Sequence, residues 1–171
     1  MPSLCVALDD PEQTAWAASV FSRCLSGMKI CPVILLQGEL GAGKTTFVRE
    51  LVIRLPGGDK AEVSSPSFNL VNYYPTRPEV AHFDLYRLEH SGLDPDLEEE
   101  IIDPGFKLLL VEWGNRLLKS LLPKNRLYLT FNIRPLGREL TIEGEQADLL
   151  ACLASLARES DISFQEEPRC R

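Results

Sequence analysis

Long hydrophobic runs are missing from this sequence. Its longest apolar stretches, at residues 33–36 and 108–111, fall far short of the roughly 20 residues that span a bilayer. The N-terminal segment has no Lys or Arg and already contains Asp9 and Asp10, so it does not resemble a secretion signal. These absences argue against an integral membrane protein and against a secreted one, and we expect a cytoplasmic protein.

Closely spaced cysteine pairs are also missing. The five cysteines form no Cys-x-x-Cys motif, and their odd number leaves one unpaired in any disulfide scheme. They are Cys5, Cys24, Cys31, Cys152 and Cys170. In a cytoplasmic protein we expect reduced thiols without a zinc or redox role.

Positive charge is in deficit, with 18 basic against 25 acidic residues and a formal net charge of -7. Charge-driven binding to nucleic acid is therefore disfavoured, because it needs basic residues that neutralise phosphates. Acidic residues gather between Asp94 and Asp103, with no base among them. This segment is either a solvated helix face or a docking surface for a basic partner.

The remaining pattern predicts an α/β protein in which strands and helices alternate. Apolar and β-branched runs predict strands at residues 4–8, 33–37, 69–74, 80–86, 107–112, 127–133 and 139–143. Helices are expected at residues 11–25, 45–55, 95–101, 115–121 and 146–158. We expect one domain over residues 1–158 and a polar, flexible tail over residues 159–171.

A phosphate-binding motif follows the apolar run at residues 33–37. The segment Gly38-Glu-Leu-Gly-Ala-Gly-Lys-Thr45 matches G-x-x-x-x-G-K-[ST] between a predicted buried strand and a predicted helix. Backbone N–H groups and the helix N-terminus of such a loop surround phosphate groups. Lys44 should reach the β- and γ-phosphates, and the Thr45 hydroxyl should bind Mg²⁺.

The motif predicts ATP and Mg²⁺ as cofactors. It also predicts a three-layer sandwich like that of P-loop NTPases, with a central, mostly parallel sheet and an added β-hairpin. The nucleotide-binding residues expected in the loop are Glu39, Leu40, Gly41, Ala42, Gly43, Lys44, Thr45 and Thr46.

Two carboxylates end predicted strands. Ligands of open α/β sheets lie beyond the carboxyl ends of the parallel strands, and Glu112 follows the more uniformly apolar run. We expect Glu112 to hold Mg²⁺ and Asp84 to orient water, with Asp84 as a further candidate for the metal. Strand alternation places His82 on the same face as Asp84, where we expect a hydrogen-bonded strand residue rather than a general base.

Three further short motifs follow the P-loop. They are Ser65-Pro-Ser-Phe68, His82-Phe-Asp-Leu-Tyr-Arg87 and Glu112-Trp113. In this order and spacing, from Gly38 to Trp113, the four motifs resemble the TsaE family, whose members are small bacterial P-loop ATPases needed to form threonylcarbamoyladenosine on tRNA.

The resemblance implies an ATP hydrolase that works with TsaD- and TsaB-like partners, and that meets tRNA only through their complex. It implies that the segment containing Ser65 and Ser67 is a nucleotide-sensing switch. Ser67 stands where threonine is commoner in the family and keeps the hydroxyl. The implied catalytic residues are Lys44, Asp84 and Glu112, with Mg²⁺ held by Thr45, Glu112 and Asp84.

Two other functions share the motif. A small kinase of a nucleoside, nucleotide or metabolite needs an arginine-bearing lid, and the arginines at positions 77, 87, 134 and 138 do not cluster in sequence. Alternation also predicts that Arg87 points away from Asp84. A regulator that binds ATP without turnover is disfavoured by the two carboxylates. The lack of a candidate arginine predicts slow hydrolysis that a partner accelerates.

Overall fold

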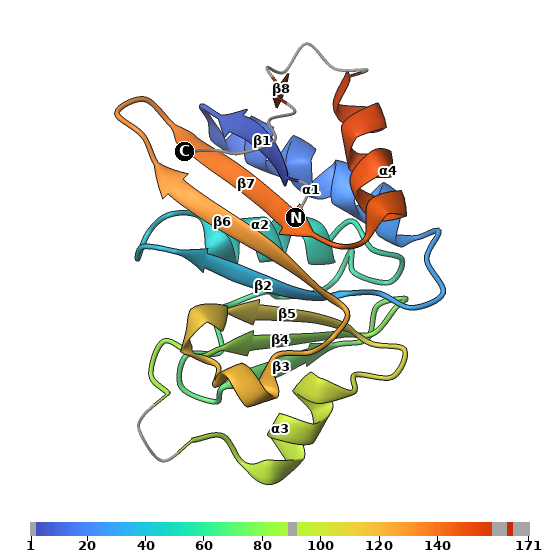
Figure 1. Cartoon of the computed structure of the whole chain (residues 1–171), viewed down its shortest axis with the longest axis vertical. Helices are drawn as coiled ribbons and strands as arrows, with labels where there is room; N and C mark the ends of the chain where they lie inside the picture. The colour runs from blue at the N-terminus through green and yellow to red at the C-terminus, as the bar shows by residue number, and fades with distance from the viewer. Residues whose placement is uncertain (1–2, 89–91, 159–163, 166–171) are drawn as a thin grey trace.

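The computed structural model describes residues 3–88, 92–158 and 164–165, and it contains one eight-stranded sheet (Figure 1). The strand order is β3-β4-β5-β2-β6-β7-β1-β8. The strands are β1 (Ser3–Leu8), β2 (Val33–Gly38), β3 (Val71–Tyr74), β4 (Val80–Asp84), β5 (Leu108–Glu112), β6 (Arg126–Ile133), β7 (Arg138–Gly144) and β8 (Phe164–Gln165). The helices are α1 (Pro11–Leu25), α2 (Lys44–Val52), α3 (Pro95–Ile102) and α4 (Ala147–Arg158).

Parallel strands form the centre of the sheet. Strands β4, β5, β2 and β6 run parallel to one another, while the pairs of β3 with β4, β6 with β7 and β1 with β7 are antiparallel. The carboxyl ends of the central strands therefore meet at one edge, which carries Gly38, Asp84 and Glu112. The predicted α/β class and the predicted β-hairpin are confirmed.

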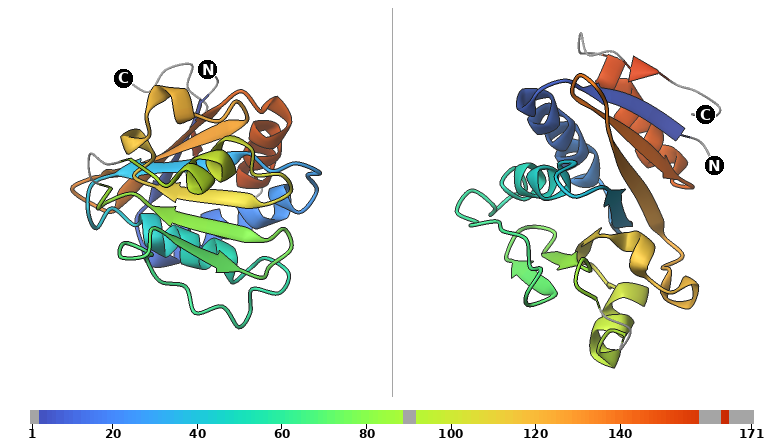
Figure 2. Two further views of the ribbon diagram at one scale, coloured as in Figure 1. Left: turned by 90° about the horizontal axis from the view of Figure 1, so that it is seen from below. Right: turned by 90° about the vertical axis from the view of Figure 1, so that its left-hand side faces the viewer.

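Two hydrophobic cores cover the two faces of the sheet. Ile34 and Leu36 of β2 pack in a core with α1, α2 and α4, whereas Val33 and Leu35 pack with α3 on the other face (Figure 2). This alternation within one strand produces the predicted three layers. Within the described residues, no helix is both long and apolar enough to cross a membrane.

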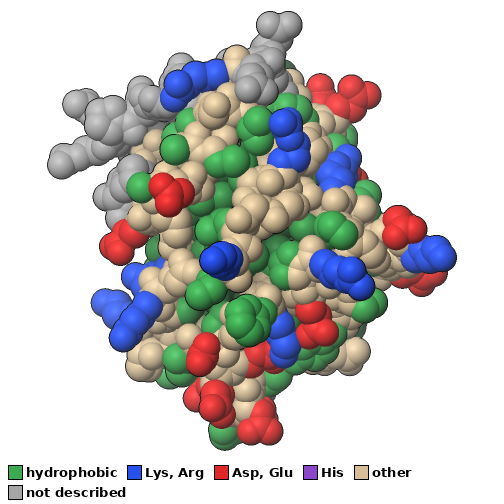
Figure 3. Space-filling view, turned by 90° about the vertical axis from the view of Figure 1, so that its right-hand side faces the viewer, with side chains coloured by type: hydrophobic (Ala, Val, Ile, Leu, Met, Phe, Trp, Pro, Cys, Tyr) green, Lys and Arg blue, Asp and Glu red, His purple; other side chains and the backbone are tan. Residues whose placement is uncertain are grey.

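The acidic segment forms α3, as predicted. The Asp94 carboxylate caps the helix by accepting a hydrogen bond from the Asp96 N–H at 3.0 Å, and Pro95 occupies the first turn. Ile101 packs in the core, while the acidic residues stay at the surface. Figure 3 shows acidic side chains at the lower end of the molecule, where α3 lies.

Two helix predictions were partly or wholly wrong. Helix α2 ends at Val52 rather than at residue 55, because the chain tightens into turns that bring the Leu55 N–H to the Val52 carbonyl. Residues 115–121 form no α-helix but two short 3-10 turns, η1 (Gly114–Arg116) and η2 (Lys119–Leu121). The backbone between them is extended, which lets Leu117 pack into the core beside α3.

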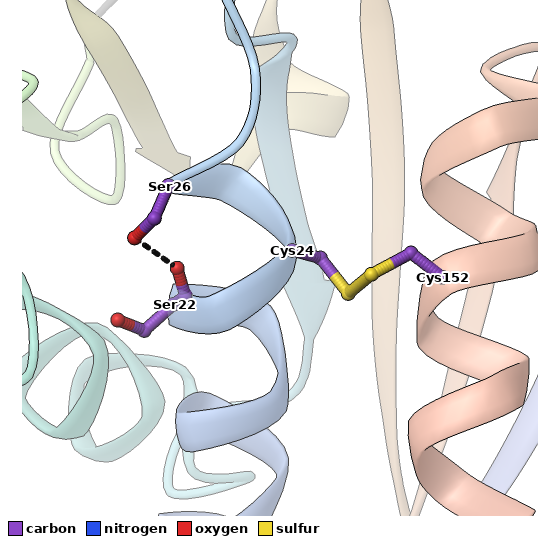
Figure 4. Close-up of a disulfide and its surroundings, with 4 residues drawn as sticks. All are labelled: Ser22, Cys24, Ser26 and Cys152. Atoms are coloured by element: carbon purple, nitrogen blue, oxygen red, sulfur yellow. Dashed lines mark hydrogen bonds between the residues drawn. A yellow bond between two sulfur atoms is a disulfide. The ribbon is translucent and has the colours of Figure 1, made fainter.

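The expectation of reduced thiols was wrong for Cys5, Cys24 and Cys152, which are all disulfide-bonded. Cys24 of α1 and Cys152 of α4 form a disulfide with Cα atoms 5.9 Å apart (Figure 4). Their separation of 128 residues hid this pairing from the sequence, because only the packing of α1 against α4 brings them together. Cys31 is a buried free thiol, and burial raises its pKa.

The tail predicted at residues 159–171 lies outside the described residues, except for β8. This two-residue strand pairs antiparallel with β1.

Candidate nucleotide-binding site

Glycines shape the loop that joins β2 to α2. Gly38 has φ +134°, and a Cβ atom there would lie 2.4 Å from the Phe131 carbonyl oxygen of β6. Gly43, with φ +108°, precedes the first residue of α2. A side chain at either position would be strained, so the loop closes over the helix N-terminus only with glycine there.

Lys44 begins α2 and points back along the loop. Its ammonium donates hydrogen bonds to the carbonyls of Gly38 and Glu39, each at 2.8 Å, and lies 4.1 Å from the ring centre of Trp113. Burial lowers the pKa of this ammonium, and the charges of Glu112 and Asp84 oppose that shift. The geometry thus keeps a cation beside two carboxylates at the end of the sheet.

The next residue of α2, Thr45, contacts the end of β5. Its hydroxyl donates a hydrogen bond to Oε1 of Glu112 at 2.7 Å. The same oxygen lies 3.0 Å from Nε2 of His82, one strand away on β4. Glu112 is almost completely buried, so its carboxylate is held between the helix and the neighbouring strand.

Asp84 ends β4 beside Glu112, with which it is in register. One of its carboxylate oxygens accepts a hydrogen bond from the Ser65 hydroxyl, and the other accepts one from the Tyr86 N–H at 2.9 Å. Asp84 thereby connects the end of the sheet to the Ser65–Phe68 segment.

These groups line a pocket of about 450 Å³. The lining includes most of the predicted site residues, namely Leu40, Gly41, Gly43, Lys44, Thr45, Thr46, Ser65, Ser67, Asp84 and Glu112. Glu39 and Ala42 are not in the lining. Glu39 contributes its carbonyl to Lys44, and the Ala42 N–H donates to that same carbonyl at 3.2 Å, so this N–H does not point freely into the pocket as expected.

The pocket also contains residues that are not among the predicted site residues. Pro11 and Thr14 reach it from the start of α1, and Arg87 and Arg138 reach it from opposite sides of the fold. The sequence had singled out no arginine as a candidate for this pocket, and the prediction that Arg87 points away from Asp84 was wrong, because both residues line the pocket.

Local geometry explains this error. Strand β4 ends at Asp84, so alternation does not extend to Arg87, whose guanidinium lies 4.2 Å from the ring centre of Phe68. Arg138 begins β7 and donates a hydrogen bond to the Gly41 carbonyl at 3.2 Å, across 97 residues of sequence. Only the pairing of β2 with β6 and of β6 with β7 brings Arg138 to the loop.

The oxygen atoms of the pocket are of the kind that Mg²⁺ prefers. In the described part of the chain, no three His, Cys, Asp or Glu side chains gather closely enough to hold a metal ion by themselves. Magnesium in nucleotide sites typically takes one or two carboxylates and completes its shell with phosphate oxygens and water. The Thr45 hydroxyl and the two carboxylates fit that pattern.

Known proteins share this sequence and fold. The family model described as threonylcarbamoyl adenosine biosynthesis protein TsaE matches residues 8–140. The tRNA threonylcarbamoyladenosine biosynthesis protein TsaE of Aquifex aeolicus is 41% identical over 113 residues, which cover 65% of this chain and 77% of that protein.

A second relative and a solved structure extend the match. The protein of the same description from Treponema pallidum is 32% identical over 139 residues, covering 81% of this chain and 98% of the relative. The crystal structure of Bacillus subtilis YdiB has the same fold, with a TM-score of 0.66 at 24% identity, over 92% of this chain and 95% of that one. The chain belongs to the TsaE family of tRNA threonylcarbamoyladenosine biosynthesis.

Proposed function

We propose that the chain is a magnesium-dependent ATPase that acts with TsaB- and TsaD-like proteins in the threonylcarbamoyladenosine modification of tRNA. The observation that carries the ATPase proposal is the hydrogen bond between the Thr45 hydroxyl and Glu112, beside the Lys44 ammonium. It joins the helix that follows the phosphate loop to a strand-end carboxylate at the position where a P-loop enzyme needs its metal.

Each charged group has a proposed role. Lys44 neutralises charge on the β- and γ-phosphates, because its ammonium is buried beside the phosphate loop. Thr45 and Glu112 hold Mg²⁺, which supplies further charge neutralisation when bound. Asp84 orients the attacking water and is connected to the switch through Ser65.

The loop backbone and the two serines complete the proposed nucleotide site. Gly41 and Gly43 leave room for phosphate oxygens, and Ser65 and Ser67 line the same pocket. Arg87 and Arg138 add positive charge at the same pocket, so they are further candidates for phosphate contacts.

A small P-loop kinase is the second candidate. Its support is that Arg87 and Arg138 both line the pocket, since kinases place arginines over the transferred phosphate. The same two arginines remove the physical argument that a partner must supply the missing charge. Dependence on TsaB- and TsaD-like partners is therefore supported by family membership.

The decisive experiment mixes the chain with ATP, Mg²⁺, tRNA, the candidate partners and a donor of the threonylcarbamoyl group. Release of inorganic phosphate together with formation of the modified adenosine would support the proposal. Lys44→Met is the control, because it keeps most of the aliphatic stem and removes the charge. In a parallel reaction that offers nucleosides, nucleotides and metabolites as acceptors, transfer of the γ-phosphate without phosphate release would instead establish the kinase.

A further inference from the structure

His82 is a buried polar residue for which the proposed reaction has no role so far. It lies in the middle of β4 and is 0% exposed to solvent. As the sequence predicted, it is a hydrogen-bonded strand residue. Its partner is Oε1 of Glu112, 3.0 Å from Nε2, and not a group elsewhere in the core.

The second ring nitrogen determines where the imidazole proton lies. Nδ1 of His82 is buried and has no hydrogen-bond partner among the described residues. A proton on Nδ1 would leave a buried N–H donor without an acceptor, which is unfavourable. A proton on Nε2 instead donates to the carboxylate of Glu112. With the proton on Nε2, the Glu112 carboxylate has a hydrogen-bond donor, and only the lone pair of Nδ1 is left without a partner in the core.

His82 therefore completes a short chain of contacts. Oε1 of Glu112 accepts one hydrogen bond from the Thr45 hydroxyl at 2.7 Å and one from His82 at 3.0 Å. Because the hydroxyl hydrogen is used toward Glu112, the lone pairs of the Thr45 oxygen are left for another ligand. Two donors on one carboxylate oxygen also restrict rotation of the Glu112 side chain.

The imidazole itself is held in place. The ring of Tyr74, on the neighbouring strand β3, is stacked on it with centroids 6.5 Å apart and an interplanar angle of 29°. The Tyr74 hydroxyl in turn lies 3.4 Å from the Ser64 carbonyl, to which it donates. The donor to Glu112 thus sits on the rigid sheet.

We propose that His82 is a positioning residue, which orients Glu112 and through it the Thr45 hydroxyl for Mg²⁺. The inference rests on the proposed magnesium-dependent function. Groups that hydrogen-bond to metal ligands fix the ligand's orientation and are worth about 10- to 100-fold in metal affinity. An imidazole that merely fills the core would have no such effect.

Two substitutions separate orientation from packing. His82→Gln keeps an N–H donor at the same number of bonds from Cβ as Nε2. His82→Met fills a similar volume without a donor. If the Met variant does not fold, His82→Asn replaces it, because its amide is polar but one bond too short to reach Glu112.

The readout is Mn²⁺ binding, followed by electron paramagnetic resonance of the free ion, to the chain with a non-hydrolysable ATP analogue. We expect His82→Met, or His82→Asn, to weaken Mn²⁺ binding at least about 10-fold, and His82→Gln to stay within about 3-fold of the wild type. Affinity for the analogue in the presence of a metal chelator should be the same in all variants, because His82 does not line the pocket.

The outcomes are distinguishable. Equal Mn²⁺ affinity in the wild type and the donorless variant would overturn the positioning role and leave the proposed function standing. Equal weakening in the Gln and donorless variants would also overturn it, because a donor would then make no difference. If the wild type binds no Mn²⁺ with the analogue, the magnesium-dependent function itself fails, and the inference fails with it.

Discussion

At the scale of single residues, Lys44 combines burial, positive charge and two backbone hydrogen bonds. We expect Lys44→Met to fold, because the aliphatic stem is largely kept, and to lose at least about 100-fold in phosphate release. The measurement is steady-state phosphate release, with circular dichroism to verify folding. Lys124→Met is the matched control, since that lysine is exposed and does not line the pocket. Turnover near the wild-type level in a folded Lys44→Met chain would remove the P-loop from the mechanism.

The two carboxylates allow a second prediction. Glu112 contacts the Thr45 hydroxyl, whereas Asp84 contacts Ser65 of the proposed switch segment. Loss of a metal ligand raises the Mg²⁺ concentration needed for activity, whereas loss of a water-orienting group lowers turnover at saturating metal. We therefore expect Glu112→Gln to shift the Mg²⁺ titration of phosphate release to higher concentration. Asp84→Asn should lower kcat and leave that titration in place. The reverse pattern would exchange the two roles.

Single residues also show which parts of the site a local sequence motif can predict. The P-loop and the strand-end acids could be predicted, because a local pattern of glycines and a run of apolar residues carry the signal. Arg87 and Arg138 could not be assigned in the same way. Arg87 lies beyond the end of β4, where side chains no longer alternate between the two faces of the sheet. Arg138 lies near the loop only because β2 pairs with β6 and β6 pairs with β7.

At the scale of secondary-structure elements, Tyr73 attaches α3 to the edge of the sheet. Its hydroxyl donates a hydrogen bond to Glu100 at 2.6 Å, and Lys107 donates to the other oxygen of that carboxylate at 2.6 Å. Burial raises the pKa of Tyr73 to about 12, with further contributions from the hydrogen bond and charge of Glu100 and the charge of Glu79. The neutral phenol is the form that holds the helix.

This gives a pH-dependent prediction. Because the folded pKa is raised, the contribution of Tyr73 to stability is complete below the ordinary tyrosine value of about 10 and is lost as the pH rises through about 12. Ultraviolet titration should include a late transition near pH 12 that Tyr73→Phe abolishes and Glu100→Gln moves downward. Tyr128→Phe, which removes another of the four tyrosines, should keep that transition. A transition near pH 12 that persists in the Tyr73→Phe variant would contradict its assignment to Tyr73.

Most elements could be predicted from their periodicity, and the failures have physical causes. Helix α1 begins where Asp10 accepts the Gln13 N–H at 2.8 Å, as the Asp-Pro signal indicates. The helix expected at residues 115–121 had adequate composition but was replaced by two turns. Tertiary packing of Leu117 into the core outweighed local helix propensity.

At the scale of the whole molecule, segments that are far apart in sequence lie together at the carboxyl ends of the central strands. Residues near positions 14, 44, 65, 84, 112 and 138 meet there because the central parallel strands end together and α1 packs beside them. The Cys24–Cys152 disulfide likewise depends on the packing of α1 against α4, because the two cysteines are 128 residues apart in sequence. Such contacts leave no local signal in a single sequence, which is why the site was predicted only in part.

The charge of the whole molecule points to a final prediction about partners. The net charge of -7 disfavours direct contact with tRNA, which supports our proposal that partner proteins connect this member of the TsaE family to tRNA. Asp96 and Glu99 of α3 are exposed, whereas Glu100 is engaged with Tyr73 and Lys107. Asp96 and Glu99 are therefore the exposed acids of α3 that are left for docking to a basic surface.

We expect TsaB- and TsaD-like proteins together to raise the rate of ATP hydrolysis by at least about fivefold, a typical allosteric coupling. We propose a physical route through Asp84, because its hydrogen bond to Ser65 connects the proposed switch segment to the proposed catalytic carboxylate. Phosphate release with and without the partners measures the stimulation, and equal rates would contradict it.

The double change Asp96→Lys and Glu99→Lys should reduce stimulation while leaving the unstimulated rate unchanged. The control is the double change Asp59→Lys and Glu145→Lys, which makes the same charge change at exposed positions away from α3. If this control also lost stimulation, net charge and not the α3 surface would determine docking.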